Sequence, residues 1–310
     1  MKSKYLKKDG YMLKGTIIKG YSSFYYVDIG EKIISCSLRG KNRIKKSDFY
    51  PGDLVEIKIT NEDKSEGVIE RTLERKNFLL RPPVANIDQI IITSAMKQPS
   101  PDYMLIDRLM AVAVSKNINP VLVFNKIDLS DEQEIESVRK RYEESEATII
   151  FISTMEKDKI SLYKKQLEEI LKNKINILAG ISGVGKTSII NILDGGDDRA
   201  VGKISEKLKR GKHTTRHTEL IQIGDHSWLA DSPGFSSLDF PKDFKPEMLP
   251  RVYIDYLKYS NLCKFNNCFH LEEPDCEIKR KIEEGILSKE RYENYKYLIE
   301  ELKSREGSQY

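Results

Sequence analysis

A glycine-rich segment has the residue types and spacing of a phosphate-binding loop. It satisfies the pattern GxxxxGK[ST] and reads Gly180-Ile181-Ser182-Gly183-Val184-Gly185-Lys186-Thr187-Ser188. Glycines let backbone N–H groups curl around the β- and γ-phosphates, Lys186 adds a positive charge, and the Thr187 hydroxyl is suited to ligate Mg²⁺. The apolar run INILA precedes the segment and the helical run TSIINIL ends it. We therefore predict a nucleotide site that uses Mg²⁺, with Lys186 as a catalytic residue.

A second motif, NKID at 125–128, follows the apolar run PVLVF and indicates which base is read. A carboxylate at Asp128 can accept hydrogen bonds from both guanine N1–H and the guanine 2-amino group, whereas adenine offers no such pair of donors. Asn125 would hold the loop, and the aliphatic stem of Lys126 would cover the base. Together with the phosphate-binding loop, this motif predicts GTP as the nucleotide.

Two further segments fit the parts of a GTPase that respond to the γ-phosphate. DSPG at 231–234 follows the strand-like run HSWLA; Asp231 would hold Mg²⁺ through water, and the Gly234 N–H would sense the γ-phosphate. The basic stretch 203–218 contains Thr214 and Thr215, either of which could supply the switch hydroxyl that reaches Mg²⁺. Alternatively, the stretch 203–218 is a solvated loop with no role in nucleotide binding.

The residue after Gly234 is Phe235, where many GTPases carry a glutamine that orients the attacking water. A phenyl ring cannot polarise water, so another polar group must act there. His213, just before the threonine pair, is our candidate catalytic residue, and His217 is the second choice.

Three cysteines and one histidine lie within 14 residues and form the pattern CxxxxCxHxxxxxC. Three soft sulfur ligands and one imidazole are the number and type of ligands for a closed tetrahedral Zn²⁺ site. A closed set of four ligands leaves no position for substrate, so we predict a structural zinc held by Cys263, Cys268, His270 and Cys276. The fourth cysteine, Cys36, lies in a predicted strand, and we expect it in a core.

The elements that must position these residues change character along the chain. Five short β-branched runs between 14 and 72 predict a small OB-type barrel, whereas the apolar runs at 87–95, 119–125, 147–153 and 174–180, with helices at 102–116 and 131–145, predict a doubly wound, mainly parallel sheet. After 240, helical stretches at about 246–261 and 277–306 flank the cysteines. We expect three domains: 1–82, an RNA-binding barrel; 83–245, an α/β nucleotide domain; and 246–310, a helical zinc domain.

The guanine motif precedes the phosphate-binding loop instead of following it, which indicates a circularly permuted GTPase. The permutation leaves the site intact, because the functional loops of a doubly wound sheet all leave the carboxyl ends of the strands.

Composition and charge limit the remaining possibilities. The 310 residues are 39% hydrophobic and 32% charged, with mean hydropathy −0.50, which favours a soluble chain. No run approaches the roughly 20 apolar residues of a membrane helix, and the charged N-terminus has no apolar segment behind it, so we expect a cytoplasmic protein that does not bind membranes. The sequence gives no basis for an oligomer, and we expect a monomer.

Residues 1–82 carry 18 basic and 11 acidic side chains, while the rest of the chain is slightly acidic. A positive barrel fits a phosphate-rich partner such as RNA. The basic and aromatic candidates for that contact are Tyr21, Phe24, Tyr25, Tyr26, Arg39, Lys41, Arg43, Lys45 and Lys46. Alternatively, the aromatic residues are core and the basic run is a solvated loop.

Taken together, NKID before GISGVGKTS, the segment KHTT, DSPGF and the cysteine cluster resemble the RsgA (YjeQ/YloQ) family over nearly the whole chain. The resemblance implies a GTP hydrolase that binds the small ribosomal subunit and its rRNA, assists late maturation and is stimulated there. It implies that His213 is catalytic and that Ser153-Thr154 backs the guanine where the family has Ser-Ala. The switch reads GKHTTR where the family usually has GRHTTT, so Lys212 and Arg216 depart from the pattern.

Two other functions remain open at this point. In one, the protein is a GTP-gated RNA-binding module in which hydrolysis only resets binding. In the other, it is an ATP-dependent P-loop enzyme in which NKID is coincidental.

Overall fold

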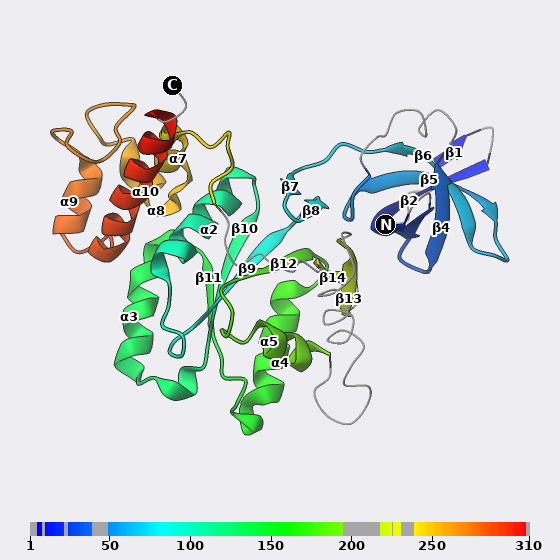
Figure 1. Ribbon diagram of the computed structural model, residues 1–310, viewed down its shortest axis with the longest axis horizontal. Coiled ribbons are helices and arrows are strands. Elements are labelled where there is room, and N and C mark those ends of the chain that lie inside the picture. Colours follow the sequence, from blue (N-terminus) through cyan, green and yellow to red (C-terminus); the bar gives the residue numbers. More distant parts are fainter. Residues whose placement is uncertain are drawn as a thin grey trace. The chain divides into compact units, whose positions relative to one another are not determined.

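The computed structural model describes residues 5–7, 10–21, 24–38, 49–194, 218–224, 226–230 and 239–307 (Figure 1). The chain divides into two compact units. The first comprises residues 1–88, 164–178 and 190–233, and the second comprises 89–163, 179–189 and 234–310. The domain boundaries predicted from the sequence, at 82/83 and 245/246, stay a prediction.

A closed five-stranded barrel forms the N-terminal part of the first unit. Strands β2, β3, β4, β6 and β5 pair in that order, and β5 pairs again with β2, which closes the ring. Inward-facing residues alternate with outward-facing ones along the strands, so the interior is filled by side chains such as Ile17, Val27 and Ile57, all fully buried. This confirms the predicted OB-type barrel. The strands are β1 (Tyr5–Lys7), β2 (Gly10–Tyr21), β3 (Phe24–Asp28), β4 (Ile33–Leu38), β5 (Leu54–Asn61) and β6 (Glu66–Thr72).

The rest of the first unit contains two smaller groups of strands. β7 (Phe78–Leu80) and β8 (Pro83–Ala85) form an antiparallel pair. β12 (Ile175–Ala179) pairs in parallel with β14 (Ser227–Ala230), with Ile175 opposite Trp228, and β14 pairs antiparallel with β13 (Leu220–Gly224).

In the second unit, β10 (Asn119–Asn125) pairs in parallel with β9 (Gln89–Ala95) and β11 (Thr148–Phe151). Every residue of β9 is buried, as expected for a strand covered on both faces. The parallel pairing of β10 with β9 and β11 in this unit, and of β12 with β14 in the first unit, confirms the predicted α/β class with mainly parallel strands. This unit contains the helices α2 (Tyr103–Ser115) and α3 (Glu132–Tyr142), with short 3-10 turns at Ile127–Leu129, Glu143–Ser145 and Lys157–Lys159. Helix α4 (Ile160–Leu171) falls mainly in the first unit, and α5 (Lys186–Leu193) is divided between the two units.

Two of these helices have an aspartate side chain as their N-terminal cap. The Asp102 carboxylate accepts a hydrogen bond from the Leu105 N–H (2.9 Å) at the start of α2. At the start of α3, Asp131 and Glu134 form a reciprocal capping box.

The C-terminal lobe of the second unit is helical. It contains a 3-10 turn at Pro246–Met248 and helices α7 (Leu249–Val252), α8 (Ile254–Ser260), α9 (Glu277–Glu283) and α10 (Lys289–Gly307). Helix α10 contacts α8, where the Tyr295 ring lies 4.9 Å from that of Tyr256. The stretch predicted at 277–306 is therefore two helices, interrupted after Glu283 near Gly285, which has φ +73°. Ala111 and Val112 of α2 are part of the same buried cluster as Leu249, Tyr295 and Leu298, so the lobe shares its core with α2.

Among the residues that the structure describes, no helix is both long and apolar enough to cross a bilayer.

Candidate functional site

The phosphate-binding loop lies between β12 and α5, as predicted, and its glycines are required by its backbone. Gly180, Gly183 and Gly185 all have positive φ. A Cβ on Gly180 would lie 2.1 Å from the Thr93 carbonyl oxygen, and one on Gly185 would lie 2.1 Å from Nδ2 of Asn125. The loop is thus held close to the ends of β9 and β10, at positions where only glycine fits.

Lys186 is the first residue of α5 and reaches back over the loop. Its Nζ donates hydrogen bonds to the carbonyl oxygens of Gly180 (2.6 Å) and Ile181 (2.7 Å). Burial lowers the pKa of the Lys186 ammonium, because the interior solvates the charged form poorly. Val184 is buried and anchors the loop, whereas Ser182, Thr187 and Ser188 are exposed.

Asn125, fully buried at the end of β10, joins three loops. Its Nδ2 donates to the Val184 carbonyl of the phosphate-binding loop (2.9 Å), while its Oδ1 accepts from the backbone N–H groups of Lys126 (2.8 Å) and Thr154 (3.2 Å). The structure therefore brings the NKID segment and the phosphate-binding loop together, with one amide side chain as their link.

The other two residues of the guanine motif are also fixed by hydrogen bonds. Lys126 adopts a left-handed conformation with φ +62°, and its Nζ donates to the Gln98 carbonyl oxygen. The hydroxyl of Ser153, which is fully buried after β11, donates to Oδ1 of Asp128 (2.5 Å). This charge-assisted hydrogen bond orients the Asp128 carboxylate, the group predicted from the sequence to read the base.

The contact of Lys126 with Gln98 could not be predicted from the sequence, because a backbone carbonyl acceptor does not depend on residue type. The hydroxyl of Ser153 also accepts from the Met155 N–H (3.1 Å), which fixes the loop behind Asp128. Ser153 ends a predicted strand next to the strand that leads to Asp128, and this position was the sequence signal for its contact with the Asp128 carboxylate.

The three cysteines and the histidine of the predicted metal site converge. Cys263, Cys268, His270 and Cys276 are all buried, and their ligand atoms lie within 4.8 Å of one another. Nδ1 of His270 is 3.7 Å from Sγ of Cys263 and 3.5 Å from Sγ of Cys276. A tetrahedral zinc with Zn–S of about 2.3 Å and Zn–N of about 2.0–2.1 Å requires S···N separations of about 3.6 Å, so the cluster fits a four-coordinate ion bound through Nδ1.

Neighbouring groups hold the histidine loop in this shape. The Glu273 carboxylate accepts from the N–H groups of Phe269 (2.7 Å) and Leu271 (2.8 Å), on either side of His270. The Tyr292 hydroxyl of α10 donates to the His270 carbonyl (2.7 Å). Burial lowers the pKa of His270 to about 4, which keeps the imidazole neutral, the form that binds a metal. The cluster can therefore hold one metal ion.

The aromatic candidates of the barrel separate into two faces. Tyr21 and Phe24 are exposed, and the Lys19 ammonium lies 4.8 Å from the ring centre of Tyr26. Tyr25 instead packs against the barrel core, with its ring 5.2 Å from that of Phe49. Tyr25 therefore belongs to the barrel core, as in the alternative interpretation of the aromatic residues. Tyr21, Phe24 and Tyr26 do not line that core. Cys36 is fully buried, which confirms its predicted place.

Several predicted residues lie outside the part of the chain that the structure describes. They are Arg39, Lys41, Arg43, Lys45, Lys46, Lys212, His213, Thr214, Thr215, Arg216, His217, Asp231, Gly234 and Phe235.

The phosphate-binding loop pattern after β12, with the NKID motif earlier in the chain after β10, defines a circularly permuted P-loop GTPase. Comparison with known families is more specific. The family model described as RsgA GTPase matches residues 72–241, and the model described as RsgA N-terminal domain matches residues 14–69. The chain belongs to the RsgA GTPase family.

Curated relatives share this family over almost their whole length. Proteins named small ribosomal subunit biogenesis GTPase RsgA are 40% identical over 293 residues in Alkaliphilus metalliredigens and 40% identical over 298 residues in Carboxydothermus hydrogenoformans. These matches cover 94% and 96% of this chain, and 98% and 100% of the relatives.

Two solved structures match at 32% identity. YloQ, described as a circularly permuted GTPase, has a TM-score of 0.80 and covers 97% of this chain and 98% of its own. YjeQ from Thermotoga maritima has a TM-score of 0.77 and covers 94% and 98%. The resemblance stated from the sequence is therefore confirmed, and so is its activity class, GTP hydrolysis.

Proposed function

We propose that this chain hydrolyses GTP as an assembly factor of the small ribosomal subunit and that contact with the subunit's rRNA stimulates the reaction. Membership of the RsgA GTPase family, whose curated relatives carry that role in their names, is the observation that carries this proposal. The geometry of the second unit supports it, because the phosphate-binding loop and the guanine motif meet through Asn125.

Recognition of the base rests on Asp128. The Ser153 hydroxyl donates to one carboxylate oxygen of Asp128, and we assign the carboxylate to guanine N1–H and the 2-amino group. Asn125 holds the loop, and the stem of Lys126, tied at its end to Gln98, covers the base. Adenine has no matching donors, so this arrangement favours GTP over ATP.

The phosphates belong to the loop 180–188. Its backbone N–H groups and the Lys186 ammonium would neutralise the β- and γ-phosphates, where charge accumulates as the terminal P–O bond breaks. The Thr187 hydroxyl would ligate the Mg²⁺ that accompanies GTP, together with Thr214 or Thr215 and, through water, Asp231. His213 would orient the attacking water, with the Gly234 N–H at the γ-phosphate.

Two accessory sites complete the proposal. The Cys263, Cys268, His270 and Cys276 cluster would hold a structural Zn²⁺, which suits three thiolates and one imidazole. The face of the barrel with Tyr21, Phe24 and Lys19 would bind rRNA by stacking and by phosphate contacts. We place the protein in the cytoplasm, where cysteine thiols stay reduced, and expect it to act as a monomer.

Base specificity can be tested with one substitution. Asp128→Asn replaces one acceptor oxygen by a donor, so binding of GDP should weaken strongly and binding of xanthosine diphosphate, whose C2 carries an oxygen, should improve. Equilibrium titration of the wild-type and variant proteins with GDP, ADP and xanthosine diphosphate measures this. Equal affinity of the wild-type protein for ADP, or no effect of the substitution, would contradict the assignment.

A further inference from the structure

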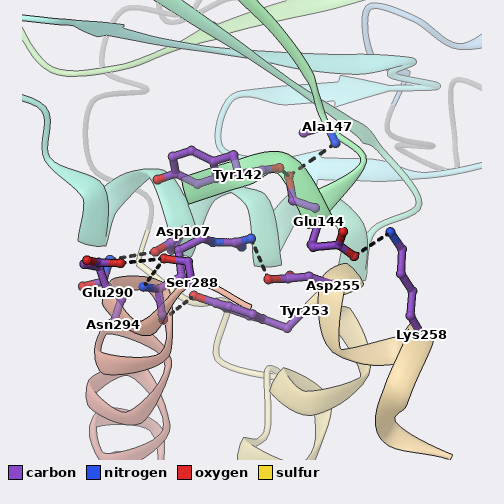
Figure 2. A network of polar contacts seen from close by, with 12 residues as sticks. Asp107, Tyr142, Glu144, Ala147, Tyr253, Asp255, Lys258, Ser288, Glu290 and Asn294 are labelled. Atoms are coloured by element: carbon purple, nitrogen blue, oxygen red, sulfur yellow. Dashed lines mark hydrogen bonds and ion pairs between the residues drawn. The ribbon is translucent and has the colours of Figure 1, made fainter. Parts of the chain in front are cut away.

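A buried network of charged side chains connects the C-terminal lobe to α2. Arg291 of α10 is 2% exposed; its Nε lies 3.0 Å from Oδ1 of Asp107 on α2, and its Nη1 lies 2.8 Å from Oδ2 of Asp255 on α8. Nδ2 of Asn294 donates to the other oxygen of Asp107 (2.7 Å). Figure 2 shows Asp107, Asp255 and Asn294 converging in this network. One guanidinium therefore joins three helices.

Aromatic rings enclose this guanidinium. Its central carbon lies 4.9 Å from the ring centre of Tyr142, at the end of α3, and 4.8 Å from that of Tyr253, between α7 and α8. Nε and Nη1 of Arg291 contact two different carboxylates, and two rings lie beside the guanidinium carbon, which together define one orientation that a lysine could not reproduce. The contact is thus geometrically specific as well as charged.

Such a network adds little to stability, because the cost of removing three charged groups from water offsets their attraction. Oδ1 of Asp255 is buried and has no hydrogen-bond partner among the residues that the structure describes, which adds to that cost. Apolar side chains could fill the same space, and the shared core of the lobe and α2 already provides apolar packing. The network is therefore better suited to fixing the position of the lobe than to holding it folded.

α2 leads from this network to the nucleotide site. The loop before α2, residues 96–102, makes two hydrogen bonds to the NKID motif. The Gln98 carbonyl accepts a hydrogen bond from the Lys126 ammonium, and the Met96 N–H donates to the Asn125 carbonyl (2.8 Å). Cδ of Pro99 in the same loop lies 3.6 Å from the position of a Cβ on Gly183. A displacement of α2 would thus reach both the guanine motif and the phosphate-binding loop.

We propose that Asp107, Arg291 and Asp255 act as a positioning unit that transmits binding of the ribosomal subunit from the C-terminal lobe through α2 to the nucleotide site. This inference rests on the proposed function. According to this inference, contacts between the subunit and the C-terminal lobe shift the 96–102 loop. That shift changes the alignment of the bound nucleotide and so raises the rate of GTP hydrolysis. Arg291 is a positioning residue, because within the described part of the chain its side chain contacts Asp107, Asp255 and the rings of Tyr142 and Tyr253, and not the phosphate-binding loop, the NKID motif or the cysteine cluster.

The test removes the network without leaving a buried charge unpaired. Arg291→Gln alone would strand two buried carboxylates and is expected to destabilise the lobe. The triple variant Asp107→Leu, Asp255→Leu, Arg291→Met keeps similar volumes and should fold. Lys296→Gln, on the same helix with an exposed ion pair to Glu293, is the matched control.

Basal GTP hydrolysis, GDP affinity and metal content of the triple variant should match those of the wild-type protein. Its subunit-stimulated kcat should fall by about tenfold, within the usual range of coupling between sites, while the subunit concentration that gives half-maximal stimulation stays unchanged. A purely structural network predicts instead that a variant as stable as the wild type is stimulated normally.

Arg291→Lys is a second variant that keeps the positive charge but cannot contact Asp107 and Asp255 with two separate nitrogens. It tests the inference if the triple variant does not fold. A lower stimulated kcat with intact basal hydrolysis supports the inference. Normal stimulation of the folded variants overturns the inference alone. If subunits do not stimulate even the wild-type protein, the proposed function fails, and this inference fails with it.

Discussion

The hydrogen bond from Ser153 to Asp128 gives a quantitative prediction. Ser153→Ala removes the 2.5 Å contact to the Asp128 carboxylate, which we propose reads the base, and it also removes the acceptor of the Met155 N–H. Hydrogen bonds to charged groups contribute about 1.5–3 kcal/mol. Because Asp128 is exposed and water can partly replace the hydroxyl, we take the lower value, about 1.5 kcal/mol, which corresponds to about tenfold weaker GDP binding.

Titration of a fluorescent GDP analogue into wild-type, Ser153→Ala and Asp128→Ala proteins measures this effect. Ser137→Ala, an exposed hydroxyl on α3, is the matched control and should bind GDP normally. Normal GDP binding by Ser153→Ala together with poor binding by Asp128→Ala would show that the hydroxyl does not orient the carboxylate, and so would an equal loss of affinity in Ser137→Ala.

Three further predictions concern catalysis, the metal and RNA. His213→Ala should retain GTP affinity but lose most of the subunit-stimulated turnover; unimpaired stimulated turnover would remove His213 from the mechanism. Burial raises the pKa of the metal-free Cys268 thiol to about 12 and also raises that of Cys276, so metal binding must release a proton from each thiol. Metal affinity should therefore rise with pH, and a chelator should remove the metal more readily at pH 6 than at pH 8; equal removal at both would contradict the cluster as the binding site. Phe24→Ala should weaken binding of single-stranded RNA by about 1–3 kcal/mol, and RNA affinity should fall steeply with salt. A flat response to salt would be inconsistent with an RNA-binding barrel.

The elements of the site could be predicted because their signals are local. Residues 120–124 of β10 are all apolar and Asn125 follows them directly, so the end of β10 and the place of Asn125 follow from the sequence. Only glycine fits at position 185, because any Cβ there would collide with Asn125. The glycine before the lysine in the P-loop pattern reflects this steric constraint. The cysteine spacing likewise allows four ligands to meet around one ion.

Contacts between distant elements could not be predicted in the same way. Asp107, Asp255 and Arg291 each read as an ordinary helical charge, and only the packing of three helices brings them together. The break between α9 and α10 is a different case, because Gly285 was a visible signal for a helix end within the stretch predicted as continuous.

The most direct test of the account is steady-state hydrolysis of GTP and ATP by the purified protein, with and without isolated small ribosomal subunits. We predict weak GTP turnover by the protein alone, a strong rise with subunits, and no comparable turnover of ATP. GTP turnover that subunits leave unchanged, or a preference for ATP, would contradict the central claim.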